Sequence, residues 1–487
     1  MDVRGSGEDL LKHSCDSRRP PMPPASRRPR SRQPELFPRS KRAAIEIAPN
    51  HRLAQITEEI DWTALEELVQ AIRLSKLKNA AGRPPHLRAL IGALVLRAMR
   101  YRTLRDLEDQ IRYYAPARLL CGLTETDWTP DANTIQDFEQ LLGEEGVRLI
   151  NEQVVTWAVA EKLADPQLVV ADTTAQEAAI PYPNEMNMMA TFVSAVAVAS
   201  KNVGAALKSF VQRAASLFQT AKKKLREFRL FAKDKTKAAR MKLTSAMANL
   251  VEQVQDGLKV ALAQASRQSL RLTKSRKVAW AKLRKLQTTM GTLLPQIRYW
   301  IKTGWVAANK VVSLHIPEIY SIVRGKVGKP VEFGLKWGMT RLRGGFVLAT
   351  LGKDKNELVD SDFAVRAAKD AKALFGKAPK AYAYDRAGWS EANVAELKQL
   401  GVRAVGLAPR GKAKWQVAGK VKDQLVSERA QVEGCIGSVK SRKYGFNKPA
   451  AKSAAAMGVC GQRSVLGFNL NKLMNGLAER REVVLVG

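Results

Sequence analysis

Apolar residues between positions 61 and 163 recur at the spacing of an α-helix. Leu65, Leu68 and Val69 share one helical face, and Asp61 precedes them as a candidate N-cap. The further predicted helices cover residues 87–100, residues 103–111 and the segment that follows a cap at Asn133 or Thr134. Several short helices with basic faces are typical of a helix-turn-helix-like DNA-binding domain, although helical bundles with other functions share the pattern.

The period of the apolar pattern changes from residue 167 onward. Residues 167–172 form a short apolar run that ends in polar residues at Asp172, which is typical of a buried strand. A predicted hairpin and then alternating helices and strands follow, at residues 331–337, 345–350, 364–375, 381–385, 391–400 and 402–407. One strand, a hairpin and then alternating helices and strands predict an α/β fold with a mixed sheet.

A basic helical segment, roughly residues 190–310, lies between the first predicted strand and the hairpin. Leu225, Phe228 and Phe231 recur at helical spacing, which predicts helices rather than a linker. Its many cations, such as Lys222, Lys223, Lys224 and Arg226, favour binding to the DNA backbone over a solvated basic face that covers a small core. Because the segment follows the first strand, we expect it to emerge near the sheet edge at which that strand ends.

The charge of the chain indicates a polyanionic partner. Its 487 residues include 81 Lys and Arg against 46 Asp and Glu, a net charge of +35, and nucleic acid is the usual partner of such an excess. Residues 1–50 are rich in Arg and Pro and cannot bury enough apolar surface to fold alone. They form either a solvated tail or a basic arm that lies along phosphates.

Cysteine and histidine usage excludes several other classes of protein. The cysteines (Cys15, Cys121, Cys435 and Cys460) form no CxxC pair, and the histidines are isolated, which argues against a disulfide framework, a zinc finger and a His-based metal cluster. The longest apolar runs are too short to cross a bilayer, and the N-terminus lacks an apolar signal core. We therefore expect a soluble, cytoplasmic protein that associates with the nucleoid and has no membrane partner.

Two predicted strands end in aspartate, at Asp172 and Asp385. If these strands are parallel neighbours, both carboxylates emerge at the same edge of the sheet, where open α/β sheets bind ligands. A single Asp at a strand end is more often a turn or helix-cap residue, so a catalytic role for the two aspartates requires a third acidic residue.

Glu433 is the third acidic residue. On a helix, Arg429, Glu433, Gly437 and Lys440 lie along one stripe, beside an apolar stripe of Val432, Ile436 and Val439 that would hold the helix to the sheet. Glycines at 434 and 437 each cost a helix about 1 kcal/mol relative to alanine, which indicates a close approach at these positions. The alternative is an exposed helix with an Arg429–Glu433 ion pair that contributes little to stability.

The blocks Asp172-Thr-Thr, Tyr384-Asp-Arg-Ala-Gly and Arg429-x3-Glu433-x6-Lys440 together resemble the DDE transposases of bacterial insertion sequences. The resemblance covers most of residues 60–475 and includes Gly82-Arg-Pro-Pro, Pro130-Asp-Ala-Asn-Thr-Ile and residues 322–334. It implies an RNase H-like catalytic domain. Two positions depart from the family pattern, because Val426 replaces a tyrosine found in one branch and Asp-Arg-Ala-Gly replaces Asp-Arg-Gly. The basic segment would explain the wide separation of the two aspartates.

The resemblance also implies how the site would work. Asp172, Asp385 and Glu433 would be the catalytic residues and the ligands of Mg²⁺, with two ions and with Mn²⁺ as a substitute. Arg429, Lys440 and Arg386 would hold DNA phosphates, and Trp389 would either stack on a flipped base or pack in the core. The partners implied are double-stranded DNA, as terminal repeats and target, and further copies of the chain in a homodimer or a larger synaptic assembly.

The predicted layout therefore has a helical DNA-binding domain, an RNase H-like mixed sheet and a basic helical insertion. Its segments are a disordered arm (1–50), the helical domain (51–165), the first part of the catalytic domain (166–189), the insertion (190–310), the rest of the catalytic domain (311–450) and a helical tail (451–487). Three alternatives remain open: a non-catalytic DNA-binding relative with the same fold, another RNase H-like nuclease, and a structural nucleoid protein.

Overall fold

The computed structural model describes residues 46–77, 85–100, 103–126, 128–203, 207–231, 236–267, 273–326, 328–409, 411 and 413–486. The described residues from 48 onward belong to one compact unit. Most of the predicted basic arm, at residues 1–45, lies outside the described residues, as do residues 82–84 of the Gly82-Arg-Pro-Pro block. None of the helices in the described part is both long enough and apolar enough to span a membrane.

The first part of the unit consists of helices. They are α1 (Arg52–Glu59), α2 (Trp62–Lys76), α3 (Leu87–Arg100), α4 (Leu104–Tyr113), α5 (Ala115–Leu120) and α6 (Ala132–Ala160). A side chain caps the start of α1, α2, α4 and α6. As predicted, the Asp61 side chain accepts a hydrogen bond from the Ala64 amide at the start of α2. The predicted cap of α6 is wrong, because Asp131 caps it and accepts from the Thr134 amide at 2.7 Å.

The sheet is mixed, with the order β2-β3-β1-β5-β6 and with β4 also paired to β3. Its strands are β1 (Asp165–Glu177), β2 (Tyr320–Lys326), β3 (Lys329–Arg343), β4 (Val347–Leu351), β5 (Ala381–Tyr384) and β6 (Ala404–Leu407). The strands β1, β3 and β4 pair antiparallel, whereas β5 pairs parallel to both β1 and β6. This confirms the predicted mixed sheet and the predicted hairpin, and it shows that the strands that contain or precede the two aspartates, β1 and β5, are parallel neighbours.

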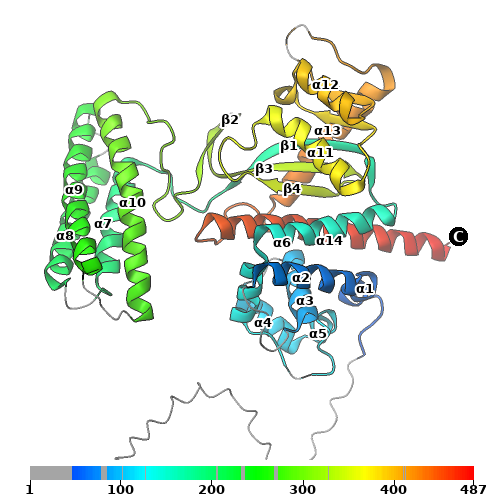
Figure 1. The fold of residues 1–487 in the computed structure, drawn as a ribbon, viewed down its shortest axis with the longest axis horizontal. Coiled ribbons are helices and arrows are strands. Elements are labelled where there is room, and N and C mark those ends of the chain that lie inside the picture. Colours follow the sequence, from blue (N-terminus) through cyan, green and yellow to red (C-terminus); the bar gives the residue numbers. More distant parts are fainter. Residues whose placement is uncertain are drawn as a thin grey trace, which may run out of the picture. The chain divides into compact units, whose positions relative to one another are not determined.

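Helices cover both faces of this sheet (Figure 1). On one face, α11 (Asp360–Phe375) and α12 (Glu391–Leu400) share a core with Val169, Ala171 and Tyr384. On the other face, α13 (Gly419–Val439) and α14 (Ala454–Val486) share a core with Val170 and Ala383. Successive side chains of a strand point to opposite faces of the sheet, so neighbouring residues of β1 belong to different cores.

The C-terminal helix α14 joins the sheet to the first group of helices, because it packs against both α6 and α3. Two glycines permit the close contacts. A Cβ added at Gly461 would lie 2.3 Å from the Trp337 ring, and one at Gly467 would lie 2.0 Å from the Ala98 carbonyl oxygen. Any side chain at these positions would therefore push α14 away from β3 and α3.

Within the described residues, the segment between β1 and β2 folds into a bundle of four helices. They are α7 (Glu185–Ser200), α8 (Lys208–Phe231), α9 (Lys237–Arg267) and α10 (Lys274–Thr303), and they have a core of their own. Leu225 and Phe228 pack against that core, which confirms that the basic segment is helical rather than a linker.

Candidate functional site

Asp172 lies within β1 and not at its end. The strand continues to Glu177, so the prediction of a strand end at Asp172 is wrong. The physical reason is the long antiparallel ladder with β3, which pairs Asp172 with Met339 and continues to Glu177 and Gly334. The parallel ladder with β5, in contrast, ends at the pair of Val170 and Ala383, so Asp172 projects just beyond the end of β5.

The strand register places Asp172 level with Asp385. The parallel pairs run from Leu168 and Ala381 to Val170 and Ala383, and two further residues along each chain reach Asp172 and Asp385. Neighbouring strands lie about 4.8 Å apart, and residues at the same level point to the same face. The printed ladder ends at Val170 and Ala383, which pack on the face that α13 covers, and continuation of the same register would carry both aspartates to that face.

Local hydrogen bonds orient both carboxylates. Asp385 directly follows β5 and caps a short 3₁₀ helix, η2 (Arg386–Gly388), where its Oδ1 accepts from the Ala387 amide at 2.8 Å. Asp172 Oδ1 accepts from the Thr173 amide at 2.7 Å. Each aspartate thus has one oxygen held by the backbone at the sheet edge, which limits the rotation of its side chain.

Two buried tyrosines line the opposite side of the same strand end. Burial raises the pKa of the Tyr384 hydroxyl far above its ordinary value, and the carboxylates of Asp360, Asp172 and Asp385 raise it further. Burial also raises the pKa of Tyr382, with Asp172 again contributing. Both hydroxyls are therefore neutral at any physiological pH, and the negative charge at this edge belongs to the carboxylates.

Glu433 lies on the same side of the sheet as the two aspartates, on α13. The predicted apolar stripe is confirmed, because Val432, Ile436 and Val439 are buried against the sheet. The Glu433 side chain itself is 68% exposed, and its Oε1 lies 3.9 Å from the Arg429 guanidinium. In the described part of the chain, no group of three or more His, Cys, Asp or Glu side chains is arranged to hold a metal ion. That Glu433 and the two aspartates form one metal site stays a prediction.

The predicted phosphate-binding residues occupy different environments around this edge. Lys440 lies over β1, where its Nζ donates to Thr174 Oγ1 at 3.2 Å and to the Ala175 carbonyl at 2.8 Å. This contact holds the Lys440 ammonium group at Thr174, which lies two residues after Asp172 on β1. Arg386 is exposed at the start of η2, immediately after Asp385. Trp389 is half-buried and packs against the α11 side of the sheet, which favours the core interpretation of this residue.

Sequence reasoning missed the ion pair that fastens α13 to the sheet. Arg341 of β3 is 4% exposed, and its guanidinium contacts Glu428 Oε2 and Gln431 Oε1, both at 2.5 Å. Arg341 follows Trp337 and Met339 at every second position of β3, so its side chain lies on the same face of the sheet as theirs, the face that α13 covers. A charged residue at a core position of a strand is the signal that could have revealed it, because such a residue requires a buried partner.

Comparisons with known proteins give matches for parts of the chain. Residues 42–141 match the family model of a transposase domain (DUF772). This stretch of the chain is similar to a transposase domain. The matched residues span α1 to α5 and the first third of α6, and they support a transposase family for the chain. Residues 145–269 match the model of stage V sporulation protein AD (SpoVAD), a stretch that begins within α6 and ends after α9. No curated protein and no solved structure matches the chain.

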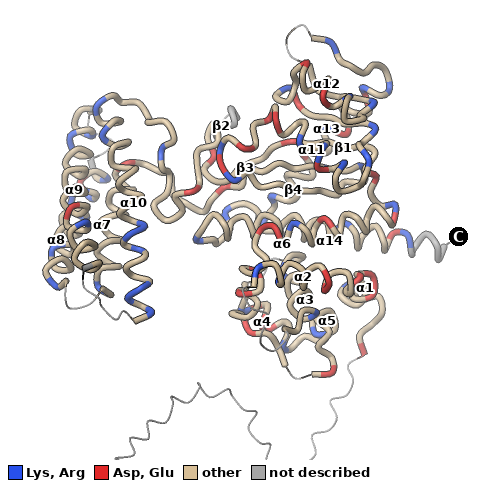
Figure 2. Tube along the Cα trace, in the orientation of Figure 1, with Lys and Arg blue, Asp and Glu red and all other residues tan. Residues whose placement is uncertain are grey.

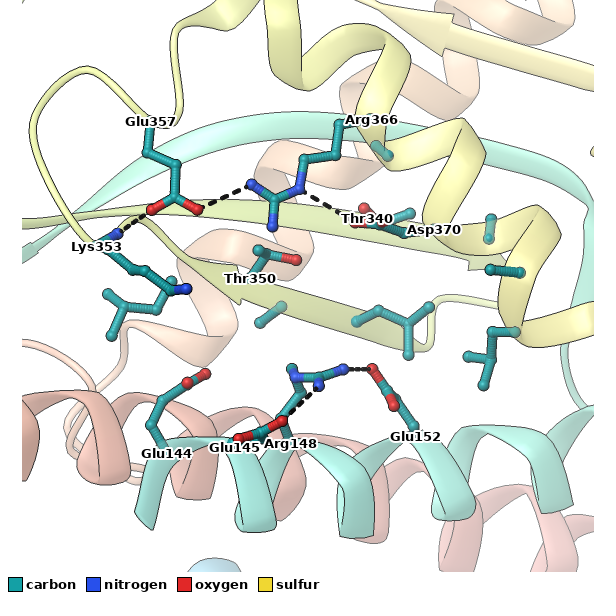
Figure 3. Close-up of a pocket in the computed structure, with 17 residues that line it drawn as sticks. Glu144, Glu145, Arg148, Glu152, Thr340, Thr350, Lys353, Glu357, Arg366 and Asp370 are labelled. Atoms are coloured by element: carbon teal, nitrogen blue, oxygen red, sulfur yellow. Dashed lines mark hydrogen bonds and ion pairs between the residues drawn. The ribbon is translucent and has the colours of Figure 1, made fainter. Parts of the chain in front are cut away.

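A charged cavity of about 570 Å³ lies on the other face of the sheet, between α6, β4 and α11 (Figure 3). Glu144, Arg148 and Glu152 project into it from α6, the helix in which the transposase domain match ends, and Arg366 and Asp370 project from α11. Arg148 pairs with Glu152, and Arg366 lies 3.7 Å from Asp370. The cavity is therefore separated from Asp172 and Asp385 by the sheet, and we do not assign it to the candidate site.

The Glu144 carboxyl in this cavity makes the stability of the fold depend on pH. Burial raises its pKa, although a hydrogen bond from Gln462 and the charge of Arg148 partly oppose the rise. A raised pKa in the folded state stabilises the fold below the ordinary value of 4.5, and this contribution is lost as the pH rises through the folded-state pKa. The ionised carboxylate is thus an unfavourable group at neutral pH.

Glu144→Gln is therefore expected to raise the free energy of unfolding at pH 7 and to leave it unchanged at pH 3.5. The amide oxygen can still accept the Gln462 hydrogen bond, which measures 2.6 Å. Chemical denaturation at the two pH values measures the difference. Glu145→Gln is the matched control, because that side chain is 70% exposed and should have little effect at either pH. A destabilised Glu144→Gln variant at pH 7 would contradict the argument.

Proposed function

We propose that the chain is a DDE transposase that cleaves DNA phosphodiesters at the ends of a mobile element and joins them to target DNA. The register that sets Asp172 level with Asp385 on neighbouring parallel strands carries the proposal. The transposase domain match at residues 42–141 supports it independently. The mixed sheet with helices on both faces is compatible with an RNase H-like catalytic domain, which we propose as the fold of residues 166–189 and 311–450.

The two aspartates suit a hard divalent cation such as Mg²⁺, with Mn²⁺ as a substitute. They offer carboxylate oxygens from adjacent strands about 4.8 Å apart, and oxygen ligands are those that Mg²⁺ prefers. Without a cation, two neighbouring carboxylates repel each other. A pair of ions bound there would neutralise the charge that develops on the attacking and leaving oxygens of an in-line displacement.

The side chains around the aspartates would position the DNA. Lys440, held over β1 by Thr174, is proposed to bind a phosphate next to the scissile one. The Arg429 and Arg386 side chains both reach solvent and would bind further phosphate oxygens. Glu433, whose side chain is mostly exposed, is proposed to leave Arg429 and complete the cation site when DNA binds. The partners proposed are duplex DNA and further copies of the chain in a synaptic assembly.

A second candidate is a DNA-binding relative that has the same fold but no catalytic activity. The observation that favours it is the exposure of Glu433, whose carboxylate forms an ion pair with Arg429. The two candidates differ in a direct assay. The full-length chain is incubated with Mg²⁺ and a duplex that carries the repeats flanking the element. A transposase nicks this DNA at the repeat ends, and a chain that binds the DNA without nicking it is the non-catalytic relative.

The glycines of α13 offer a test of how closely DNA approaches this helix. A Cβ at Gly434 or Gly437 would meet no described atom within 4 Å, so neither glycine serves a contact within the described chain. The double variant Gly434→Ala/Gly437→Ala should therefore raise the free energy of unfolding by about 1–2 kcal/mol, because alanine is the better helix former.

The same double variant should nick DNA more slowly and bind it more weakly if the backbone of DNA contacts α13 at these positions. Gel-shift titration and the nicking assay measure the two effects. Gly257→Ala in α9 is the control, because its Cβ would also meet only ordinary contacts, at 3.8 Å from Phe210. Stabilisation with unchanged binding and nicking would show that DNA does not contact this side of α13.

A further inference from the structure

The bundle presents one face whose middle is free of charge. Helix α7 packs against α8, α9 and α10, and Glu185–Ser200 contains no Lys or Arg. Its exposed side chains include Thr191 and Val198. The single acidic residue of α7, Glu185, is engaged by Lys310 at 2.5 Å, and both side chains are only 14% exposed. The surface of α7 is therefore small and neutral, and the charges around it come from its neighbours.

Cations of α8 border one end of this face. A groove between α7 and α8 is lined by Thr191 and Ser194 on one side and by Lys222 and Arg229 on the other. Lys222 is exposed and lies over the Phe218 ring at 5.4 Å, and the Arg229 guanidinium donates to Asn187 Oδ1 at 3.1 Å. These contacts direct both cations along α7 while they remain accessible to solvent. Among the cations named from the sequence, Lys222 lines this groove.

Cations of α10 border the other end of the same face. A second groove, between the last turn of α7 and the start of α10, is lined by Val198, Asn202, Lys274 and Lys282. Val278, between these two lysines on α10, is 63% exposed and widens the apolar floor of the groove. Arg276, Lys277, Arg284 and Lys285 add charge on the exposed sides of α10, which Figure 2 shows as a run of blue along the first half of this helix.

The two groups of cations lie at opposite corners of the face. Along α7, the groove with α8 is centred near Ala190 and the groove with α10 near Ala199, which are about 14 Å apart at 1.5 Å per residue. The helices α8 and α10 each pack against both α7 and α9, so they lie on a diagonal of the bundle, about 13 Å apart at a helix spacing of about 9 Å. The combined separation of roughly 20 Å exceeds the major-groove width of about 12 Å, so the two groups can reach different backbone segments of one duplex.

The opposite face of the bundle carries paired charges instead. On α9, Glu252 pairs with Arg298 at 2.8 Å and Asp256 lies 3.7 Å from Lys259. Residues 185–303 as a whole contain 24 Lys and Arg against 5 Asp and Glu. Two of these five acidic residues, Glu252 and Asp256, lie on α9, whereas the one acidic residue of α7 is engaged by Lys310. Such a surface fits a polyanion with charges spaced along two strands.

We propose that the α7 face of the bundle, flanked by Lys222 and Arg229 at one end and by Lys274 and Lys282 at the other, binds the phosphate backbone of duplex DNA independently of its sequence. This inference rests on the proposed function for its partner but concerns a surface separate from Asp172 and Asp385. Contacts of this kind add affinity for any duplex and contribute no preference for terminal repeats, which we assign to the transposase domain.

The test compares two sets of four substitutions in the full-length chain. The face variant carries Lys222→Gln, Arg229→Gln, Lys274→Gln and Lys282→Gln. The control variant carries Arg240→Gln, Lys242→Gln, Lys259→Gln and Lys302→Gln, which remove the same charge from exposed positions of α9 and of the last turn of α10. Binding to a 30-base-pair duplex is measured between 50 and 300 mM salt without divalent cations, so that no cleavage occurs.

The face variant is expected to bind all duplex sequences more weakly and to lose about 3 to 4 units from the magnitude of the salt slope, at about 0.9 per phosphate contact. The control variant should keep the slope within about one unit. Restoring charge with Lys222→Arg, Lys274→Arg and Lys282→Arg should preserve the slope of the native chain, which separates loss of contact from misfolding.

Equal slopes for the face and control variants would overturn the proposal, as would a face variant that weakens only single-stranded DNA or RNA. The proposed function fails in a different assay, the nicking of DNA. A chain that never nicks DNA can still show a difference in salt slope between the face and control variants. Conversely, if the native chain nicks DNA and the face and control variants have equal salt slopes, the proposed function holds and the α7 face is not a DNA-binding surface.

Discussion

Asp172→Asn and Asp385→Asn are each expected to abolish metal-dependent nicking, with a fall in rate of at least about 10³-fold, which corresponds to about 4 kcal/mol. Asparagine has the shape of aspartate but lacks the charge that holds a divalent cation. The two residues share one level of the sheet, so either substitution leaves half of the carboxylate pair. Affinity for DNA should stay equal or increase, because each change removes a negative charge that repels phosphate. Single-turnover nicking and gel-shift titration measure the two effects.

A control for these variants is Asp362→Asn. This residue is exposed in the first turn of α11, a helix that packs on the other face of the sheet, and its substitution removes the same charge. The control should nick DNA at the rate of the native chain. Full activity in either Asp172→Asn or Asp385→Asn would exclude the proposed site. Glu433→Gln separates the remaining candidates for the third ligand, since it abolishes nicking if Glu433 completes the site and leaves the rate unchanged if it remains paired with Arg429.

Arg341→Met is expected to lower the free energy of unfolding by about 3–5 kcal/mol. The substitution leaves Glu428, whose side chain is 12% exposed, as an uncompensated charge between α13 and β3. It also removes the contact to Gln431, so α13 loses a polar attachment to the sheet within five residues of Glu433. Denaturant unfolding measures the stability, and the nicking rate should fall together with it because α13 carries the proposed third ligand.

The double variant Arg341→Met/Glu428→Leu should recover most of the lost stability, because it removes both charges and leaves apolar groups of similar volume. Arg112→Met is the control for loss of an ion pair at the surface. Arg112 lies 2.6 Å from Glu108 and its side chain is 44% exposed, so this change should cost no more than about 1 kcal/mol. A loss from Arg341→Met as small as that from Arg112→Met would show that the buried pair does not hold α13 in place.

Local patterns in the sequence determined most elements of the fold. Asp61 was recognisable as a helix cap, and the alternating and apolar runs marked β5 and the hairpin of β3 and β4. The stripe of Val432, Ile436 and Val439 identified the buried side of α13. These features depend on residues close together in the chain, where backbone hydrogen bonding and side-chain periodicity act directly.

Contacts between distant segments decided what the sequence could not. The length of β1 depends on pairing with β3, which begins about 150 residues later, so Asp172 could not be recognised as lying within a strand. The role of α14 is similar, because its packing against α3 and β3 relies on the contacts of Gly467 and Gly461 with residues far from them in the sequence.

The candidate site shows the same division between sequence and structure. The order of Asp172, Asp385 and Glu433 along the chain, and the resemblance it carries, were visible from the sequence alone. That the two aspartates lie level, that Glu433 points to solvent beside Arg429 and that Arg341 fastens α13 were not. A register and a buried ion pair are properties of two segments in contact, and their geometry arises only when the sheet and the helix pack together.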